Sequence, residues 1–176
     1  MPRVPYVASD LTEPRAIVEA VRARRGGSLL NLDRMLLHSP EMAAGWNAHL
    51  GAIRTQLQLS AKLRELAMCV VAVLNRADYE FHHHAPEFLK AGGTPGQLGA
   101  LRDPQRAQVN DALFDATERA ALAVAIEMTL AVTVSDASFE ALARALPVRE
   151  RVEFVGTVAT YNMVSRFLVA LEVGPE

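Results

Sequence analysis

Helix start and stop signals follow one another along most of this chain, and they constrain its fold more than any other feature. Thr12-Glu13-Pro14, Ser39-Pro40-Glu41 and Thr94-Pro95 each combine a capping hydroxyl with an early proline. Gly26-Gly27 and Gly92-Gly93 are typical of helix ends. Apolar residues recur at helical spacing between these signals, and no segment alternates strictly as a strand does. The chain is therefore predicted to be all-α.

We expect about seven to nine helices in one domain that covers residues 1–176. Residues 102–110 are polar and are predicted to form a linker that could include one helical turn. The composition agrees with helix packing, because 51% of the residues are hydrophobic and only 6% are aromatic. The expected helices cover about 12–26, 40–56, 61–75, 79–91, 94–101, 117–132, 135–146 and 147–171.

The charge and cysteine content exclude several classes of function. A net charge of -2 provides no field for nucleic acid or an anionic membrane, so neither is an expected partner. The longest apolar runs, such as 66–74, are too short to span a bilayer, and the N-terminus lacks the apolar core of a signal peptide. The single cysteine, Cys69, allows no intrachain disulfide. We therefore expect a soluble cytoplasmic protein.

The residues that best suit chemistry are Glu65, Glu80 and His84. Glu80 and His84 are four residues apart, so they lie on one helix face, roughly 40° apart around the axis. A carboxylate beside an imidazole transfers protons near neutral pH. The sequence leaves two alternatives open: Glu65 could be a first-turn acid favoured by the helix dipole, and Glu80 with His84 could be an exposed surface pair.

Metal binding and thiol chemistry are weaker interpretations of the same segment. Glu80 and His83 have the Glu-x-x-His spacing of di-iron bundles, but the chain has no second copy. A mononuclear site from Glu65, Glu80 and His84 is conceivable, although we expect no metal. Cys69 lies mid-helix in an apolar run, which is typical of a buried structural cysteine.

A second polar patch lies in the last expected helix, from Tyr161-Asn162 to Arg166. An arginine among apolar neighbours needs a carboxylate partner if it is buried. The patch is either an ion pair or a place where the Arg166 guanidinium binds a substrate carboxylate. Tyr79 and His83, beside the acid–imidazole residues, are further candidates for substrate contact.

Three stretches resemble the carboxymuconolactone decarboxylase family, which shares the all-helical fold of alkylhydroperoxidase D. They are Arg64-Glu65-Leu66-Ala67, the residues 78–86 and Ala91-Gly92. The resemblance covers about 42–101, with helices about 117–171 packed on this core. The stretch from Tyr161 to Arg166 is similar to the C-terminal helix of longer members.

The resemblance implies which branch of the family this chain follows. In the alkylhydroperoxidase branch, a Cys-x-x-Cys pair precedes a histidine, and a glutamate on the preceding helix completes a proton relay. The two cysteines fall here on Ala77 and Glu80, the histidine on His84 and the relay acid on Glu65. Both sulfurs are missing, so peroxidase activity inherited through the family is chemically inconsistent with this chain.

The decarboxylase branch implies a carboxylated lactone from aromatic catabolism, or a related organic acid, as substrate. We expect His84 to act as acid, Glu80 as orienting or relay group and Glu65 as second proton carrier, with Tyr79, His83 and Arg166 contacting substrate. No cofactor is expected, because the lactone serves as its own electron sink. The family resemblance also implies a trimer or hexamer. Two alternatives are antioxidant peroxidase activity and a non-catalytic oligomer that binds small molecules.

Overall fold

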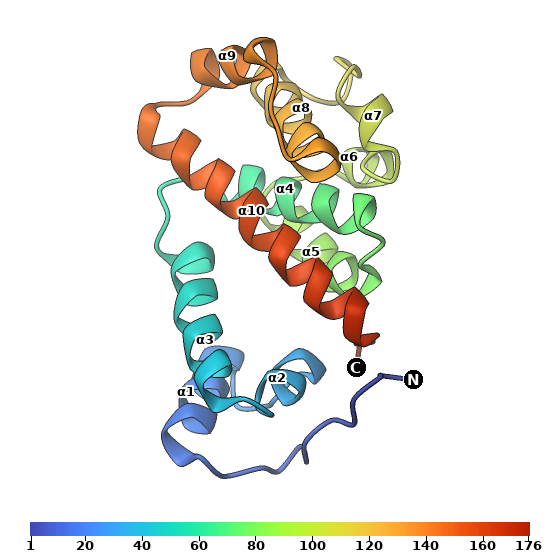
Figure 1. The fold of residues 1–176 in the computed structure, drawn as a ribbon. Helices are drawn as coiled ribbons and strands as arrows, with labels where there is room; N and C mark the ends of the chain where they lie inside the picture. The colour runs from blue at the N-terminus through green and yellow to red at the C-terminus, as the bar shows by residue number, and fades with distance from the viewer. The chain divides into compact units, whose positions relative to one another are not determined.

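The protein is built from ten α-helices and has no strand. The structure is a computed structural model and describes residues 1–176. The all-α prediction is confirmed, but the helix count exceeds the expected seven to nine. The helices are α1 (Arg15–Arg25), α2 (Asn31–Leu36), α3 (Pro40–Thr55), α4 (Ala61–Leu74), α5 (Asp78–Lys90), α6 (Pro95–Ala100), α7 (Pro104–Ala107), α8 (Ala116–Ala131), α9 (Asp136–Ala145) and α10 (Val148–Leu171) (Figure 1).

The two helices beyond the expected set are short and are held by side-chain hydrogen bonds at their first turns. Asp33 Oδ2 accepts the Leu30 backbone N–H at 3.1 Å at the start of α2. The Asp103 side chain accepts the Arg106 backbone N–H at 3.3 Å and caps α7. Such local caps stabilise one or two helical turns that are too short to show a periodic pattern.

The chain divides into two compact units, with α10 passing from one to the other. One unit comprises residues 1–57 and 168–176, and within it α3 packs against α1 and α2. The other comprises residues 58–167, and within it α4 packs against α5 and α8, and α8 packs against α9. The acid–imidazole residues all belong to this second unit.

Helix α4 is the central helix of the second unit, as its apolar sequence predicted. Ser60 caps it by accepting the Leu63 backbone N–H at 3.3 Å. Each residue from Leu66 to Val71 is fully buried. A helix that is apolar on every side needs neighbours around its whole circumference.

Two helix starts differ from the prediction. Helix α1 begins at Arg15 after Pro14, which makes no side-chain cap, so Thr12 is not its capping residue. Helix α8 begins at Ala116, because Asp115 rather than Thr117 provides the cap. Asp115 Oδ1 accepts the Glu118 N–H at 2.8 Å, and Glu118 Oε2 accepts the Asp115 N–H at 3.0 Å. This reciprocal pair is a capping box.

Helix α10 is long and apolar enough to cross a membrane if only length and composition are considered. Charged residues interrupt the apolar runs of α10, so the sequence did not suggest a membrane-spanning helix there. Half of the most apolar 18-residue stretch of α10 is buried inside the structure. The core helix of a soluble protein passes the same criterion, so this finding is weak evidence for a membrane segment.

The packing after the end of α5 requires a residue without a side chain at Gly93. Gly93 donates its N–H to the Phe88 carbonyl at 2.9 Å, and a Cβ on Gly93 would overlap the fully buried Phe88 ring. We expect Gly93→Ala to lower the free energy of unfolding by about 1–3 kcal/mol through overpacking. Gly99→Ala is the matched control, because a Cβ there meets no neighbouring atom. Urea unfolding measures both, and equal stability of the two variants would contradict the packing argument.

Candidate active site

Glu65 enters the site from the second turn of α4. It is not an exposed first-turn acid, because only 5% of the residue is exposed. The capping oxygen of Ser60 fixes where α4 begins and therefore which residues face α5. The helix around Glu65 is packed with apolar side chains, and this leaves the carboxylate few partners other than those that α5 supplies.

Glu80 and His84 enter the site from α5 on one face of the helix. Both are buried, with 3% of each residue exposed, so the exposed-pair alternative is wrong. His82 is exposed and His83 is half-buried, as expected for three consecutive residues that point in different directions around a helix. The fold therefore selects His84 among the three histidines.

The imidazole of His84 lies between two carboxylates. Its Nδ1 is 2.6 Å from Glu65 Oε2, and its Nε2 is 3.3 Å from Glu80 Oε2. The exposed side-chain fractions of His84, Glu65 and Glu80 are 4%, 6% and 5%, so water screens these contacts little. A protonated imidazole donates through both nitrogens and suits this arrangement better than the neutral ring, which has only one N–H.

These contacts determine the protonation of His84. Burial alone lowers the pKa of His84, and this is the largest single influence. The hydrogen bonds to Glu65 and then Glu80, together with the two negative charges, outweigh burial and raise the pKa above 6.5. A folded-state pKa above that value favours the imidazolium near neutral pH.

Two further groups complete the surroundings. Arg64 Nε lies 3.8 Å from Glu65 Oε1, so a guanidinium faces the second oxygen of the carboxylate that holds His84. Tyr161 of α10 presents its ring at 86° to the His84 ring, with 4.9 Å between the centroids. With His84 protonated, two cations and two anions balance within the cluster. Tyr161 appeared in the sequence only as part of a polar patch, and α10 packing brings it to the imidazole.

The same geometry argues against a single metal ion ligated by Glu65, Glu80 and His84. The two carboxylates lie at different ring nitrogens, on opposite sides of the imidazole. One ion could bind one nitrogen and its facing carboxylate, but not the carboxylate across the ring. No group of three His, Cys, Asp or Glu side chains in the structure has an arrangement suited to a metal.

Cys69 lies one turn beyond Glu65 on α4 and is completely buried, as expected of a structural cysteine. Burial, together with the Glu65 charge, raises the pKa of the Cys69 thiol to about 12. Nucleophilic and redox chemistry require the thiolate, so Cys69 is poorly suited to both.

The three predicted substrate contacts lie in different surroundings. Tyr79 is buried, and its ring contacts that of His83 in a tilted arrangement, with an interplanar angle of 51° and 4.4 Å between the centroids. Arg166 is exposed and donates Nη1 to the Asn162 carbonyl at 2.9 Å and to Asn162 Oδ1 at 2.8 Å. The amide of Asn162, and not a carboxylate, is therefore its partner.

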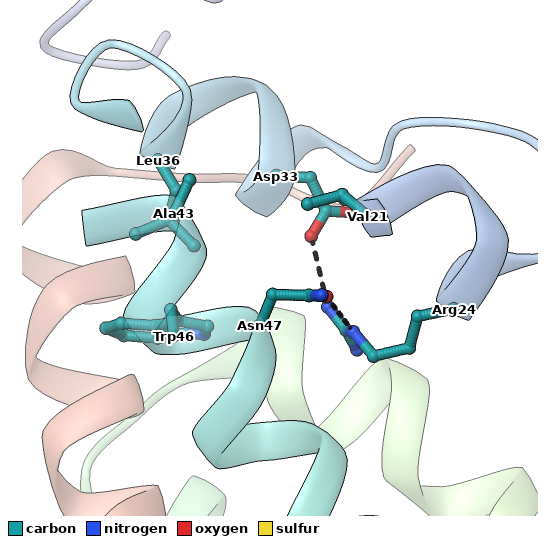
Figure 2. A pocket seen from close by; sticks show the side chains of 7 residues that line it. All are labelled: Val21, Arg24, Asp33, Leu36, Ala43, Trp46 and Asn47. Carbon is teal, nitrogen blue, oxygen red and sulfur yellow. Dashed lines mark hydrogen bonds and ion pairs between the residues drawn. The ribbon is translucent and has the colours of Figure 1, made fainter. Parts of the chain in front are cut away.

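A second polar cluster, in the unit formed by residues 1–57 and 168–176, is filled by its own side chains. Figure 2 shows the Arg24 guanidinium close to Asp33 and Asn47, in a pocket that Trp46 also lines. Arg24 Nη2 lies 3.5 Å from Asp33 Oδ1, and Arg24 Nε donates to Asn47 Oδ1. Arg25 also pairs with Asp33, at 3.0 Å. This network joins α1, α2 and α3, and we interpret it as structural.

The comparisons with known proteins agree with this fold. A peroxidase-related protein from Silicibacter sp. TM1040 has a TM-score of 0.81 at 22% identity, covering 99% of this chain and 92% of the other. An uncharacterised peroxidase-related protein from Ralstonia eutropha JMP134, described as an alkylhydroperoxidase AhpD core, scores 0.80 at 20% identity with the same coverage. The debrominase Bmp8, solved as a cysteine-to-alanine variant with 2,3,4-tribromopyrrole, scores 0.77 at 16% identity, covering 99% and 94%.

At these identities the likeness shows a common alkylhydroperoxidase D-like fold and does not extend to activity. No curated protein matches the chain. The family model for carboxymuconolactone decarboxylases matches residues 40–127, which include Glu65, Glu80 and His84. This match extends beyond the predicted core of 42–101, as far as α8. The protein belongs to the carboxymuconolactone decarboxylase family.

Proposed function

We propose that this protein is a cofactor-independent enzyme that decarboxylates, or transfers a proton within, a small carboxylated lactone or a related organic acid. The observation that supports this proposal is the buried imidazole of His84 between the carboxylates of Glu65 and Glu80. Burying two carboxylates and an imidazole away from water costs free energy. Buried titratable groups of this kind are found at catalytic sites more often than elsewhere.

The proposed reaction begins with cleavage of the bond between the lactone ring and its carboxylate. Carbon dioxide leaves, and the electron pair passes into the conjugated lactone carbonyl to give a dienolate. A carbon of the dienolate then takes the proton from Nε2 of His84, because Nδ1 is held by the shorter contact to Glu65. Glu80, which faces Nε2, relays a replacement proton from solvent and returns His84 to the imidazolium.

The residues do not support thiol-dependent peroxidase chemistry. At the positions of the two cysteines of the peroxidase branch, this chain has Ala77 and Glu80. Ala77 is the residue before α5 and makes no side-chain hydrogen bond to the helix, and Glu80 faces His84. Cys69 is buried with its pKa raised to about 12. The debrominase neighbour was solved with a cysteine replaced by alanine, and the single cysteine of the present chain is buried.

Decarboxylation in deuterium oxide tests the proposal. We expect the purified protein to release carbon dioxide from a butenolide with a carboxylate on its ring, and to place one deuterium on the product carbon. Proton NMR follows both the loss of substrate and the site of the label. Release of carbon dioxide with a racemic label, at the rate of the uncatalysed reaction, would count against catalysis.

The same preparation is offered a hydroperoxide together with a dithiol reductant. No consumption above background is expected, because no thiolate is available. A robust peroxidase rate that disappears in Cys69→Ala would replace the proposed function with a redox activity.

A further inference from the structure

Arg64 directly precedes Glu65 on α4, and its side chain lies mostly inside the protein. Only 14% of the side chain is exposed, and its Nε is buried and makes no hydrogen bond. Arginine side chains usually reach solvent, and a buried N–H group without a hydrogen bond costs free energy. The position of this guanidinium therefore needs a compensating interaction.

The charge that faces the Arg64 guanidinium is that of Glu65. Arg64 Nε lies 3.8 Å from Glu65 Oε1, which is too long for a hydrogen bond but close enough for a strong attraction where water screens little. The other oxygen of this carboxylate, Oε2, lies 2.6 Å from Nδ1 of His84. One carboxylate thus interacts with two cations, the permanent guanidinium of Arg64 and the imidazolium of His84.

The other cations around α4 and α5 have different partners. Lys62, two residues before Arg64, pairs with Glu118 of α8 at 2.6 Å. Arg102, which precedes α7, lies on the ring of Phe81, with 3.6 Å between its Cζ and the ring centroid. Helix α6, which packs against α5, carries no titratable side chain.

Glu80, Tyr161 and Cys69 are the other titratable residues around the acid–imidazole cluster. Glu80 lies 3.3 Å from Nε2 of His84, and the Tyr161 ring is nearly perpendicular to the imidazole. The Cys69 thiol is neutral, because its pKa is raised to about 12. Arg64 is therefore the cation that remains in the cluster when His84 has lost its proton.

We propose that Arg64 is a positioning residue for the proton transfer, because its permanent charge offsets that of Glu65 and makes His84 a stronger acid. This inference rests on the proposed function and deepens it. When Nε2 gives its proton to the substrate carbon, the electron pair of the N–H bond stays on the ring, and two buried carboxylates lose their imidazolium partner. The Arg64 charge stabilises this state, whereas without it the carboxylates would hold the proton on His84 more tightly.

Titration of the His84 imidazole NMR signals tests this inference without any substrate. We expect Arg64→Gln to raise the pKa of His84 by about 0.5–1 unit, because removal of a nearby cation favours the protonated ring. Damage to α4 would have the opposite effect, since water that enters the cluster weakens its contacts and returns the pKa of His84 downward toward 6.5. The direction of the change separates an electrostatic role from a structural one.

Two further variants at the same position make the test specific for charge. Arg64→Met fills similar space without a charge and should give the same rise in the pKa of His84 as Arg64→Gln. Arg64→Lys keeps the positive charge and should leave this pKa close to that of wild type. A rise in Arg64→Lys equal to that in Arg64→Met would overturn the inference, because the charge would then not be the cause.

Lys62→Gln is the matched control, since it removes a cation from the same helix that pairs with Glu118 instead. It should leave the pKa of His84 unchanged. An unchanged or lowered pKa in both Arg64→Gln and Arg64→Met overturns the inference, and so does an equal rise in Lys62→Gln. Thermal melting shows whether each variant is folded.

Steady-state kinetics separate this inference from the proposed function. If both are correct, kcat of Arg64→Gln falls by about 2- to 5-fold, because a weaker acid transfers its proton more slowly, and the alkaline limb of its pH profile moves to higher pH. A raised pKa in Arg64→Gln without any wild-type turnover would leave the effect of Arg64 on His84 standing and remove the decarboxylase proposal. Wild-type turnover with an unchanged pKa in Arg64→Gln would do the reverse.

Discussion

Replacing His84 with alanine is expected to lower turnover by about 100- to 10,000-fold, the usual range for loss of a general acid. His84 is the only one of the three consecutive histidines with a carboxylate at each ring nitrogen. No neighbouring group duplicates its proton at the same position. Initial rates of carbon dioxide release at several pH values measure the effect.

His82→Ala is the matched control for His84→Ala. It removes the same side chain from the same helix, but His82 is exposed and faces away from the acids. Its turnover should equal that of wild type. Equal losses in the two variants would indicate damage to α5 rather than loss of an acid, and undiminished turnover in His84→Ala would exclude His84 from the reaction.

The His84→Ala protein must also be checked for folding. Removing the imidazole leaves two buried carboxylates without their common partner, and breaking a buried ion pair in this way costs about 3–5 kcal/mol. His84→Gln provides a second variant, since its amide supplies a hydrogen-bond donor to one carboxylate. A folded His84→Gln protein without turnover supports the catalytic role independently of stability.

Replacing Glu65 with glutamine is expected to lower the pKa of His84 further than replacing Glu80. Glu65 makes the shorter contact, 2.6 Å against 3.3 Å, and its hydrogen bond is the strongest of the influences that raise this pKa. The glutamine oxygen can still accept from Nδ1, but it carries no charge to stabilise the imidazolium. Titration of the imidazole carbon and nitrogen NMR signals measures the pKa in wild type, Glu65→Gln and Glu80→Gln.

The same substitution changes how stability depends on pH. In wild type the folded pKa of His84 lies above its ordinary value of 6.5. The stabilisation from this shift is therefore fully present below about pH 6.5 and is lost as pH rises through the folded pKa. Glu65→Gln should be less stable than wild type at low pH, and the difference should narrow as pH rises. Urea unfolding across this range measures the trend.

Two results would contradict this account of the cluster. A larger fall of the His84 pKa in Glu80→Gln than in Glu65→Gln would assign the controlling contact to Glu80. An unchanged pKa in both variants would mean that the carboxylates do not determine the protonation of His84, and the proposed acid would then need another source.

Most of the fold follows from local sequence signals. The start of α4 at Ser60 and the end of α5 at Gly92-Gly93 are set by capping chemistry that acts within one turn. Helix α2 was not predicted, and α7 was expected only as one possible helical turn within residues 102–110, since four to six residues carry too little periodicity to distinguish a helix from a loop.

The membership of the candidate site follows partly from the sequence as well. The spacing of Glu80 and His84 on one helix face depends only on helix geometry. Glu65 was a candidate from the sequence as well, but only the resemblance implied that it acts together with Glu80 and His84, because no local spacing connects it to them.

The tertiary structure alone decided which groups meet. Helix α4 brings Glu65 to the ring nitrogen that Glu80 does not face, and α10 places Tyr161 against the same ring. For Arg166 the sequence left open an ion pair or a substrate carboxylate, and the structure shows the backbone and side-chain oxygens of Asn162 as its partners. Local propensity depends on neighbours within a few residues, whereas a buried charge network depends on which distant helices pack together, and that is a property of the folded chain.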